Sequence, residues 1–162
     1  MTARKKKLTE GAVVDSSAII SIFDRRPSSQ AFRQALRETR PLYMSAATFV
    51  EISLVVLGKK AEAGLAPLDE MIRAFGIEIV AFDLLMAENS RKGCSAYGKG
   101  HNPASLNMGD LYSYGLAMSK NLPLFFEGLD FFQTDVQDAM AMLGYRFDEQ
   151  HQPLPLGPAL SL

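Results

Sequence analysis

Four acidic residues stand where one expected segment of regular structure gives way to the next: Asp15, Glu51, Asp110 and Asp130. Asp15 and Asp130 each follow an apolar run that predicts a buried strand, whereas Glu51 and Asp110 stand near the starts of helical patterns. Carboxylates gathered in one cleft repel one another and raise each other's pKa unless a cation neutralises them. The pattern therefore predicts a site for a hard divalent cation.

Each of these acids also has a purely structural interpretation. Thr48 and Glu51 match the capping box, in which the glutamate accepts a hydrogen bond from an amide at the helix end. Asp110 suits a first-turn acid that complements the helix dipole, and Asp130 after a glycine suits a turn. Asp15 is the hardest to explain in this way, because an acid at the end of a fully buried strand loses hydration and needs a partner.

Helical and strand patterns alternate along the chain, which favours a single α/β domain with a central parallel sheet and helices on both faces. Strands are expected at residues 12–15, 42–44, 77–82 and 122–126, with a short edge strand at 145–147. Helices are expected at residues 29–40, from about 48 to 58, 68–75, 84–96, from 110 to about 122, and 134–143. Ligands of such sheets collect at the carboxyl ends of the strands, which gives the four acids a shared location.

Composition fits one compact domain, because 48% of the 162 residues are hydrophobic. The single cysteine, Cys94, rules out an internal disulfide, and no segment has the apolar length of a membrane span. We therefore expect a cytoplasmic protein. Its expected parts are a basic leader at residues 1–11, a domain at 12–147 and a Pro-rich tail at 148–162 that lies extended on the surface.

The net charge of −1 hides an uneven distribution. Residues 1–7 carry four basic side chains and no acid, so the rest of the chain has 13 basic and 18 acidic residues, a balance of −5. A mildly acidic body argues against a broad phosphate-binding surface, although a local basic strip beside a metal would still serve an enzyme.

Four ordered segments of the sequence resemble the signature motifs of the PIN domain family. Within that family the chain is most similar to the VapC toxins of type II toxin–antitoxin modules. The segments are Val14-Asp15-Ser16-Ser17-Ala18, Thr48-Phe49-Val50-Glu51, Leu106-Asn107-Met108-Gly109-Asp110 and Gly128-Leu129-Asp130-Phe131. The resemblance runs from about residue 12 to residue 147, and its strength comes from the order of the whole set.

The resemblance implies a small α/β domain with Mg²⁺- or Mn²⁺-dependent endoribonuclease activity. It also implies a homodimer that is inhibited by a cognate VapB-like antitoxin occupying the active site. Because Mg²⁺ keeps several waters, Asp15 and Asp110 are assigned as direct ligands, with Glu51 and Asp130 acting through water or on a second ion. A metal-activated water would then attack the RNA phosphodiester.

Other residues are candidates for supporting roles. Ser17 and Thr48 carry hydroxyls that would orient the carboxylates, although both are also ordinary helix-start residues. Asn107 either contacts the site or caps the helix of Asp110, and Asp135 either adds charge to the site or begins a helix. Residues expected to contact RNA phosphates, or else to be solvated charges, are Arg91, Lys92, Lys99 and His101.

Two positions depart from the pattern of the family. Leu129 stands where a polar or acidic residue often precedes the fourth acid, and Glu127 stands where a basic residue is common. We expect Glu127 to make the edge of the cleft more acidic.

Two other functions remain open from the sequence. A PIN-fold binding module with little nuclease activity would share every residue of the toxin, so only activity separates the two. An aspartyl phosphatase is disfavoured, because Ser17 stands where the common type has a second aspartate, and no Gly-rich phosphate loop is present.

Overall fold

A four-stranded parallel sheet forms the centre of the molecule, as the sequence predicts. The computed structural model describes residues 8–100 and 102–155. The strands lie in the order β3-β2-β1-β4. Every neighbouring pair is parallel, and the elements are β1 (Ala12–Val14), β2 (Leu42–Ser45), β3 (Ile77–Val80) and β4 (Leu124–Phe125).

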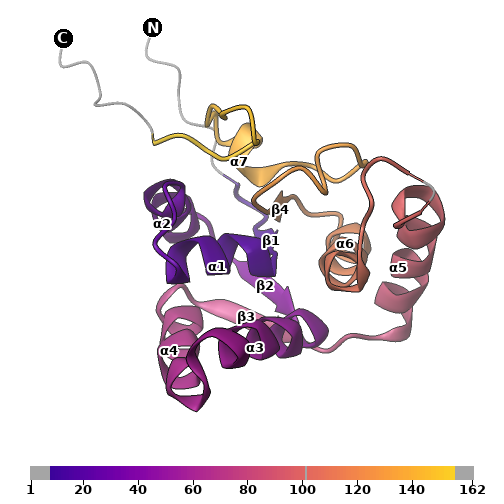
Figure 1. Cartoon of the computed structure of the whole chain (residues 1–162). Helices are drawn as coiled ribbons and strands as arrows, with labels where there is room; N and C mark the ends of the chain where they lie inside the picture. Colours follow the sequence, from indigo (N-terminus) through magenta and orange to yellow (C-terminus); the bar gives the residue numbers. More distant parts are fainter. Residues whose placement is uncertain (1–7, 101, 156–162) are drawn as a thin grey trace, which may run out of the picture.

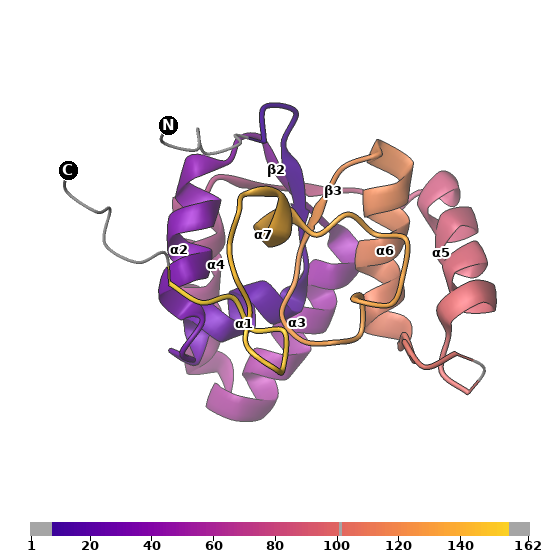
Figure 2. The same cartoon turned by 90° about the horizontal axis from the view of Figure 1, so that it is seen from above.

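Helices cover both faces of this sheet (Figure 1). One side carries α1 (Ser16–Phe23), α2 (Ser29–Glu38), α3 (Ala46–Lys60) and α4 (Leu65–Ala74), with a 3₁₀ turn, η1 (Glu62–Gly64), before α4. The other side carries α6 (Met108–Lys120), and α5 (Leu84–Tyr97) lies outside α6 in both views (Figures 1 and 2). A short helix, α7 (Ala139–Met142), packs beside β4.

The alternation of side chains along the strands divides the core into two clusters. In β1, Ala12 and Val14 join the cluster under α1 to α4, whereas Val13 joins the cluster under α6. In β4, Phe125 joins the cluster under α1 to α4, and Leu124 joins the cluster under α6. All five side chains are fully buried, which explains why these strands read as continuous apolar runs rather than alternating ones.

A glycine sets the spacing between α5 and α6. A Cβ atom at Gly115 would lie 2.2 Å from Ser90 Oγ and 2.5 Å from the carbonyl oxygen of Met86. The Ser90 hydroxyl donates to the carbonyl of Leu111 at 2.6 Å, which joins the two helices across this contact. Close approach of the backbones therefore holds α5 against α6.

Two helices differ from the sequence-based expectation. No helix was predicted over α1, because its eight residues are apolar on almost every side and show no amphipathic period. Helix α3 begins at Ala46 rather than near Thr48 and runs through Gly58 to Lys60. Gly58 is exposed with open space where a side chain would lie, and the helix continues through it because a single glycine inside a helix costs only about 1 kcal/mol relative to alanine.

The region after β4 was also predicted incorrectly. The expected helix at residues 134–143 is confined to α7, which Asp138 caps, because residues 131–134 close a turn instead. Residues 145–147 add no strand to the sheet, and Phe147 instead bridges Pro153.

The expected extended conformation of the tail is wrong for residues 148–154, which form a surface hairpin through this bridge and contact the domain where His151 meets Asp138. Residues 156–162 and the leader residues 1–7 lie outside the described part of the chain. In the described part, no helix combines the length and apolar character that crossing a bilayer requires.

Candidate active site

Asp15 lies at the carboxyl end of β1 and caps α1. Its Oδ2 accepts hydrogen bonds from the amide of Ser17 at 2.9 Å and from the hydroxyl of Ser17 at 2.6 Å. Its Oδ1 is buried and has no hydrogen-bond partner. The residue is only 2% exposed, and this burial raises the pKa of Asp15 although the Ser17 donors lower it. One carboxylate oxygen is thus left without compensation.

Glu51 lies within α3, and its carboxylate faces the first turn of α6. A Cβ atom at Gly109 would lie 3.0 Å from Glu51 Oε1, so the glycine leaves room for the carboxylate. Glu51 Oε2 is buried without a partner. Burial raises the pKa of Glu51, the nearby Ser16 hydroxyl lowers it, and the charge of Asp15 raises it further.

The capping-box interpretation of Glu51 is wrong. Ser45 is the N-cap of α3 and its side chain accepts from the amide of Thr48, so Glu51 lies beyond the first turn. Glu51 is therefore not needed to satisfy the end of the helix.

Asp110 combines a structural role with a place in the acidic cluster. Asn107 accepts from the amide of Asp110 at 3.1 Å, and Asp110 Oδ2 accepts from the amide of Asn107 at 2.9 Å, which completes a capping box. Burial raises the pKa of Asp110 to about 7, with a further rise from the charge of Asp15 and smaller ones from Asp130 and Glu51. The four acids thus share one electrostatic environment.

Asp130 occupies the exposed rim of this cluster. It lies in a turn after β4 rather than on a helix or strand. Partial desolvation raises the pKa of Asp130, and its charge in turn raises the pKa of Asp110. Because the side chain is exposed, this desolvation is weaker than that of the buried Asp15.

The cluster fits a divalent cation by its chemistry. Two buried carboxylate oxygens, Asp15 Oδ1 and Glu51 Oε2, lack any donor, and such atoms are costly unless a ligand satisfies them. Within residues 8–100 and 102–155, no three acidic, histidine or cysteine side chains are arranged closely enough to hold one ion as they stand. A shared cation would therefore require these carboxylates to turn toward it.

The hydroxyl groups of Ser113 and Ser16 also lie near the acids, and the sequence did not predict a role for either. The Ser113 hydroxyl lowers the pKa of Asp15 and the Ser16 hydroxyl lowers that of Glu51, although neither hydroxyl lies in hydrogen-bonding geometry with the unpartnered oxygen of its acid. Thr48 Oγ1 lies 3.3 Å from Ser113 Oγ, so the predicted Thr48 reaches Asp15 only through Ser113. The signal for Ser113 was its spacing, because it lies one helical turn after Asp110 on the same face.

The other supporting candidates lie in different settings. Ser17 contacts Asp15 directly, and its hydroxyl also accepts from the amide of Glu127 at 3.0 Å. Asn107 caps α6. Asp135 accepts a hydrogen bond from the Tyr114 hydroxyl at 3.0 Å and thereby ties the segment after β4 to α6.

Glu127 does not act as a free acid at the edge of the cleft, contrary to expectation. Its side chain is only 4% exposed. Arg26 Nη1 lies 3.1 Å from Glu127 Oε1, and the Ser28 hydroxyl donates to Glu127 Oε2. Ser28 Oγ in turn lies 2.6 Å from Ser21 Oγ. Each oxygen of this carboxylate therefore has a partner, and Arg26 compensates its charge.

The predicted RNA-contacting residues are dispersed. Arg91 and Lys92 lie exposed on α5, which packs mainly on α6, and they line a shallow hollow with Glu88 and Ser95. Lys99 lies in the loop between α5 and α6, where its amide donates to the carbonyl of Leu106 at 3.1 Å. His101 falls outside the described residues. None of the four acids lines the α5 hollow.

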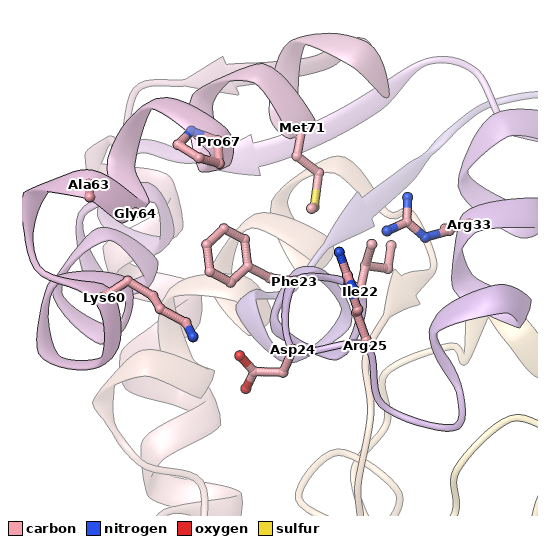
Figure 3. A pocket seen from close by; sticks show the side chains of 10 residues that line it. All are labelled: Ile22, Phe23, Asp24, Arg25, Arg33, Lys60, Ala63, Gly64, Pro67 and Met71. Carbon is pink, nitrogen blue, oxygen red and sulfur yellow. The ribbon is translucent and has the colours of Figure 1, made fainter.

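Two other hollows differ in character. A groove of about 470 Å³ lies directly beside Glu51, and exposed apolar side chains form most of its wall. It is lined by Ala47, Val50, Glu51, Leu54, Met108, Gly109 and Tyr112. A pocket of about 700 Å³ lies between α1, α2, α3 and α4, away from the acids. Figure 3 shows Arg25 and Arg33 at one end of this pocket and Lys60 at the other, with the Phe23 ring between them.

Residues 12–137 match the family model described as PIN domain. The chain belongs to the PIN domain family. It is 35% identical over 124 residues to the VapC ribonuclease Mb0640 of Mycobacterium bovis, covering 76% of this chain and 95% of that protein. It is 34% identical over 124 residues to the ribonuclease VapC of Mycolicibacterium smegmatis, covering 76% of this chain and 96% of that protein. These relatives place the PIN domain among the VapC proteins, as the sequence motifs predict.

Solved structures agree with this fold. The chain is similar to VapBC2 from Rickettsia felis bound to a DNA fragment from its promoter, with a TM-score of 0.61 and 17% identity over 78% of this chain and 95% of that one. It is also similar to DNA-bound VapBC from Salmonella typhimurium, with a TM-score of 0.62 and 17% identity over 79% of this chain and 96% of that one. At these identities the likeness bears on the fold alone.

Proposed function

We propose that this PIN domain is a Mg²⁺- or Mn²⁺-dependent endoribonuclease and the toxin of a type II toxin–antitoxin module. The observation that carries the proposal is the cluster in which Asp15 and Glu51 each keep a buried oxygen without a donor. A cluster of mutually repelling carboxylates costs stability, and functional sites are where such costs are commonly kept. The relatives at about 35% identity are named VapC ribonucleases, which supports RNA as the substrate.

Asp15 and Asp110 are proposed as the direct cation ligands. Asp15 offers its unpartnered Oδ1 while Ser17 holds Oδ2 in place. Asp110 has one oxygen bonded to the amide of Asn107, which fixes its orientation. When bound, a divalent cation would supply an acidified water as nucleophile and positive charge beside the scissile phosphate.

Glu51 and Asp130 are proposed to act on the water and on the charge around it. Glu51 Oε2 has no hydrogen-bond partner, so it is free to accept a proton or a hydrogen bond from a bound water. Asp130 is exposed at the rim of the cluster, where a bound RNA would be accessible to it. Arg91, Lys92, Lys99 and His101 remain candidates for phosphate contacts.

A VapB-like antitoxin is the proposed partner, because the similar folds were solved as VapBC complexes. The apolar groove beside Glu51 suits such a partner: Val50, Leu54 and Met108 are 57%, 64% and 68% exposed. An antitoxin segment there would reach the site and block it. A homodimer and a cytoplasmic location complete the proposal, and light scattering of the purified protein tests the dimer.

The same groove keeps a second candidate function open, a PIN-fold binding module with little nuclease activity. The deciding experiment is cleavage of a structured RNA pool by antitoxin-free protein with Mg²⁺, Mn²⁺ or EDTA, beside Asp110→Asn prepared identically. The nuclease proposal expects cleavage that needs the cation and is lost in the variant. Failure of the folded wild type to cleave would favour the binding module.

A further inference from the structure

Asp130 differs from the other three acids in having no regular element to hold it. The turn that carries it closes through two backbone bonds, from Phe132 to the carbonyl of Leu129 at 3.2 Å and from Thr134 to that of Phe131 at 3.1 Å. The remaining acids lie in helices or cap them. The position of Asp130 must therefore depend on how the side chains beside it are anchored.

Two aromatic rings after Asp130 provide that anchorage, one inside the domain and one outside. Phe131 is 2% exposed, and its ring centroid lies 5.2 Å from that of Phe126. Phe132 is 59% exposed, and its ring centroid lies 4.6 Å from that of His151. The outer support of the turn is thus a residue of the C-terminal segment.

His151 is itself held firmly. Its ring stacks on Phe147 at 4.1 Å with an interplanar angle of 4°, and its Nε2 lies 2.8 Å from Asp138 Oδ2. The side chain is 11% exposed. Phe147 pairs antiparallel with Pro153, so residues 146–154 form a hairpin with His151 near its tip.

This hairpin is tied to the sheet through Asp138. The backbone at Asp138 bridges Leu124 of β4, and the amide of Leu124 donates to the carbonyl of Gln137 at 2.8 Å. A continuous series of contacts therefore runs from β4 through Asp138 and His151 to Phe132, two residues from Asp130. The backbone of His151 is left-handed, with φ of 56°, a conformation that a residue with a side chain rarely adopts.

We propose that the C-terminal hairpin, residues 146–154, positions Asp130 for the reaction, with His151 acting through Phe132. The hairpin lies beyond residues 12–137, the part of the chain that matches the PIN domain model. The catalytic part of the inference rests on the proposed nuclease function, whereas the positioning itself does not.

Hydrogen exchange of the full-length, metal-free protein tests the positioning directly. His151→Ala should speed exchange at residues 128–135 by about tenfold or more, while residues 12–18 and α6 keep wild-type protection. Phe132→Ala removes the same contact from the other side, at an exposed residue that the fold does not need, and should give the same local change. His151→Phe keeps the ring stacking and should retain most of the protection.

The matched control is Gln150→Ala, an exposed neighbour on the hairpin whose side chain makes no hydrogen bond among the described residues. The positioning proposal is overturned if His151→Ala and Phe132→Ala exchange like this control at residues 128–135. The same holds if exchange rises throughout the domain, because the hairpin would then support the whole fold rather than the turn.

Cleavage kinetics test whether the positioning matters for catalysis. His151→Ala should lower kcat by about tenfold with little change in KM, because a displaced carboxylate affects the reacting geometry more than RNA binding. In an Asp130→Asn background the same substitution should cause no further loss. A further loss in the double variant would show that His151 does not act through Asp130. If the wild type cleaves no RNA, the nuclease proposal fails while the exchange result still decides the positioning.

Discussion

Two buried acids, Asp15 and Glu127, both contact Ser17 but differ in whether their carboxylate oxygens have partners. Ser17 donates its hydroxyl to Asp15 and accepts from the backbone amide of Glu127. Glu127 is satisfied by Arg26 and Ser28, whereas Asp15 keeps one oxygen without any donor. Burial of a carboxylate is therefore not a sign of function in itself. The informative feature is a buried oxygen that the protein leaves unsatisfied.

The largest expected effect is on cleavage by Asp15→Asn. Replacing the carboxylate with an amide of the same shape removes a proposed cation ligand and should lower kcat/KM by on the order of a thousandfold. The substitution also removes a desolvated charge, so urea denaturation of the metal-free variant at pH 8 should show no loss of stability. A variant with near-wild-type cleavage would contradict the role given to Asp15.

The pH dependence of stability is expected to reflect the unsatisfied acids. The pKa of Asp110 rises from 3.8 to about 7 in the folded protein, so the native state binds a proton more tightly than the unfolded state. Between about pH 4 and pH 7 the unfolded state therefore holds fewer protons, and stability falls as the pH rises. Urea midpoints of EDTA-treated protein should show a loss of about 2 kcal/mol across this window, allowing for solvent screening.

Two controls sharpen this pH prediction. Asp110→Asn should flatten the slope, and saturating Mn²⁺ should do the same at neutral pH, because a bound cation favours the ionised carboxylates. If the free energy of unfolding of the wild type rises from pH 5 to pH 7, other titrating groups dominate its pH dependence. The acidic cluster would then not destabilise the metal-free fold.

Glu127→Gln should affect stability rather than chemistry. The change removes the charge that pairs with Arg26, whose side chain is 40% exposed, so we expect a loss of about 1–2 kcal/mol in the free energy of unfolding. Cleavage should remain within about threefold of wild type, because the Glu127 side chain does not contact Asp15. A loss of cleavage as large as that of Asp15→Asn would remove the distinction between the two acids.

Gly109→Ala gives the smallest expected effect. The new Cβ would lie 3.0 Å from Glu51 Oε1 and press the flexible carboxylate away by a few tenths of an ångström. Cleavage should fall by a few-fold, while thermal stability stays equal or rises slightly, because alanine favours the helix. Met108→Ala, at an exposed neighbouring side chain, is the control for stability. Unchanged cleavage would mean that the orientation of Glu51 is not critical.

The sequence predicted the sheet, and the position of Asp15 at its edge, because both depend on local signals. Buried parallel strands read as apolar runs, and Asp15 follows its run directly, so the location of this acid needs only the polarity of a parallel sheet. The same reasoning missed α1, since a short helix buried on most sides has no amphipathic stripe.

Long-range pairing accounts for most of what the sequence left out. The partners Arg26 and Glu127 lie 101 residues apart, so no local pattern indicates that Glu127 is neutralised. His151 meets Phe132 and Asp138 only because the chain folds back after α7, in a Pro-containing segment that lacks a core-forming period. Ser113 is the exception, because its spacing from Asp110 would have identified it.

The most direct test of the central claim is a Mn²⁺ titration of antitoxin-free protein, followed by electron paramagnetic resonance, on wild type, Asp15→Asn and Glu127→Gln. If the unsatisfied carboxylates form the cation site, wild type and Glu127→Gln bind Mn²⁺ with similar affinity and Asp15→Asn loses most of it. Equal binding by all three proteins, or a loss in Glu127→Gln that matches the loss in Asp15→Asn, would contradict the claim.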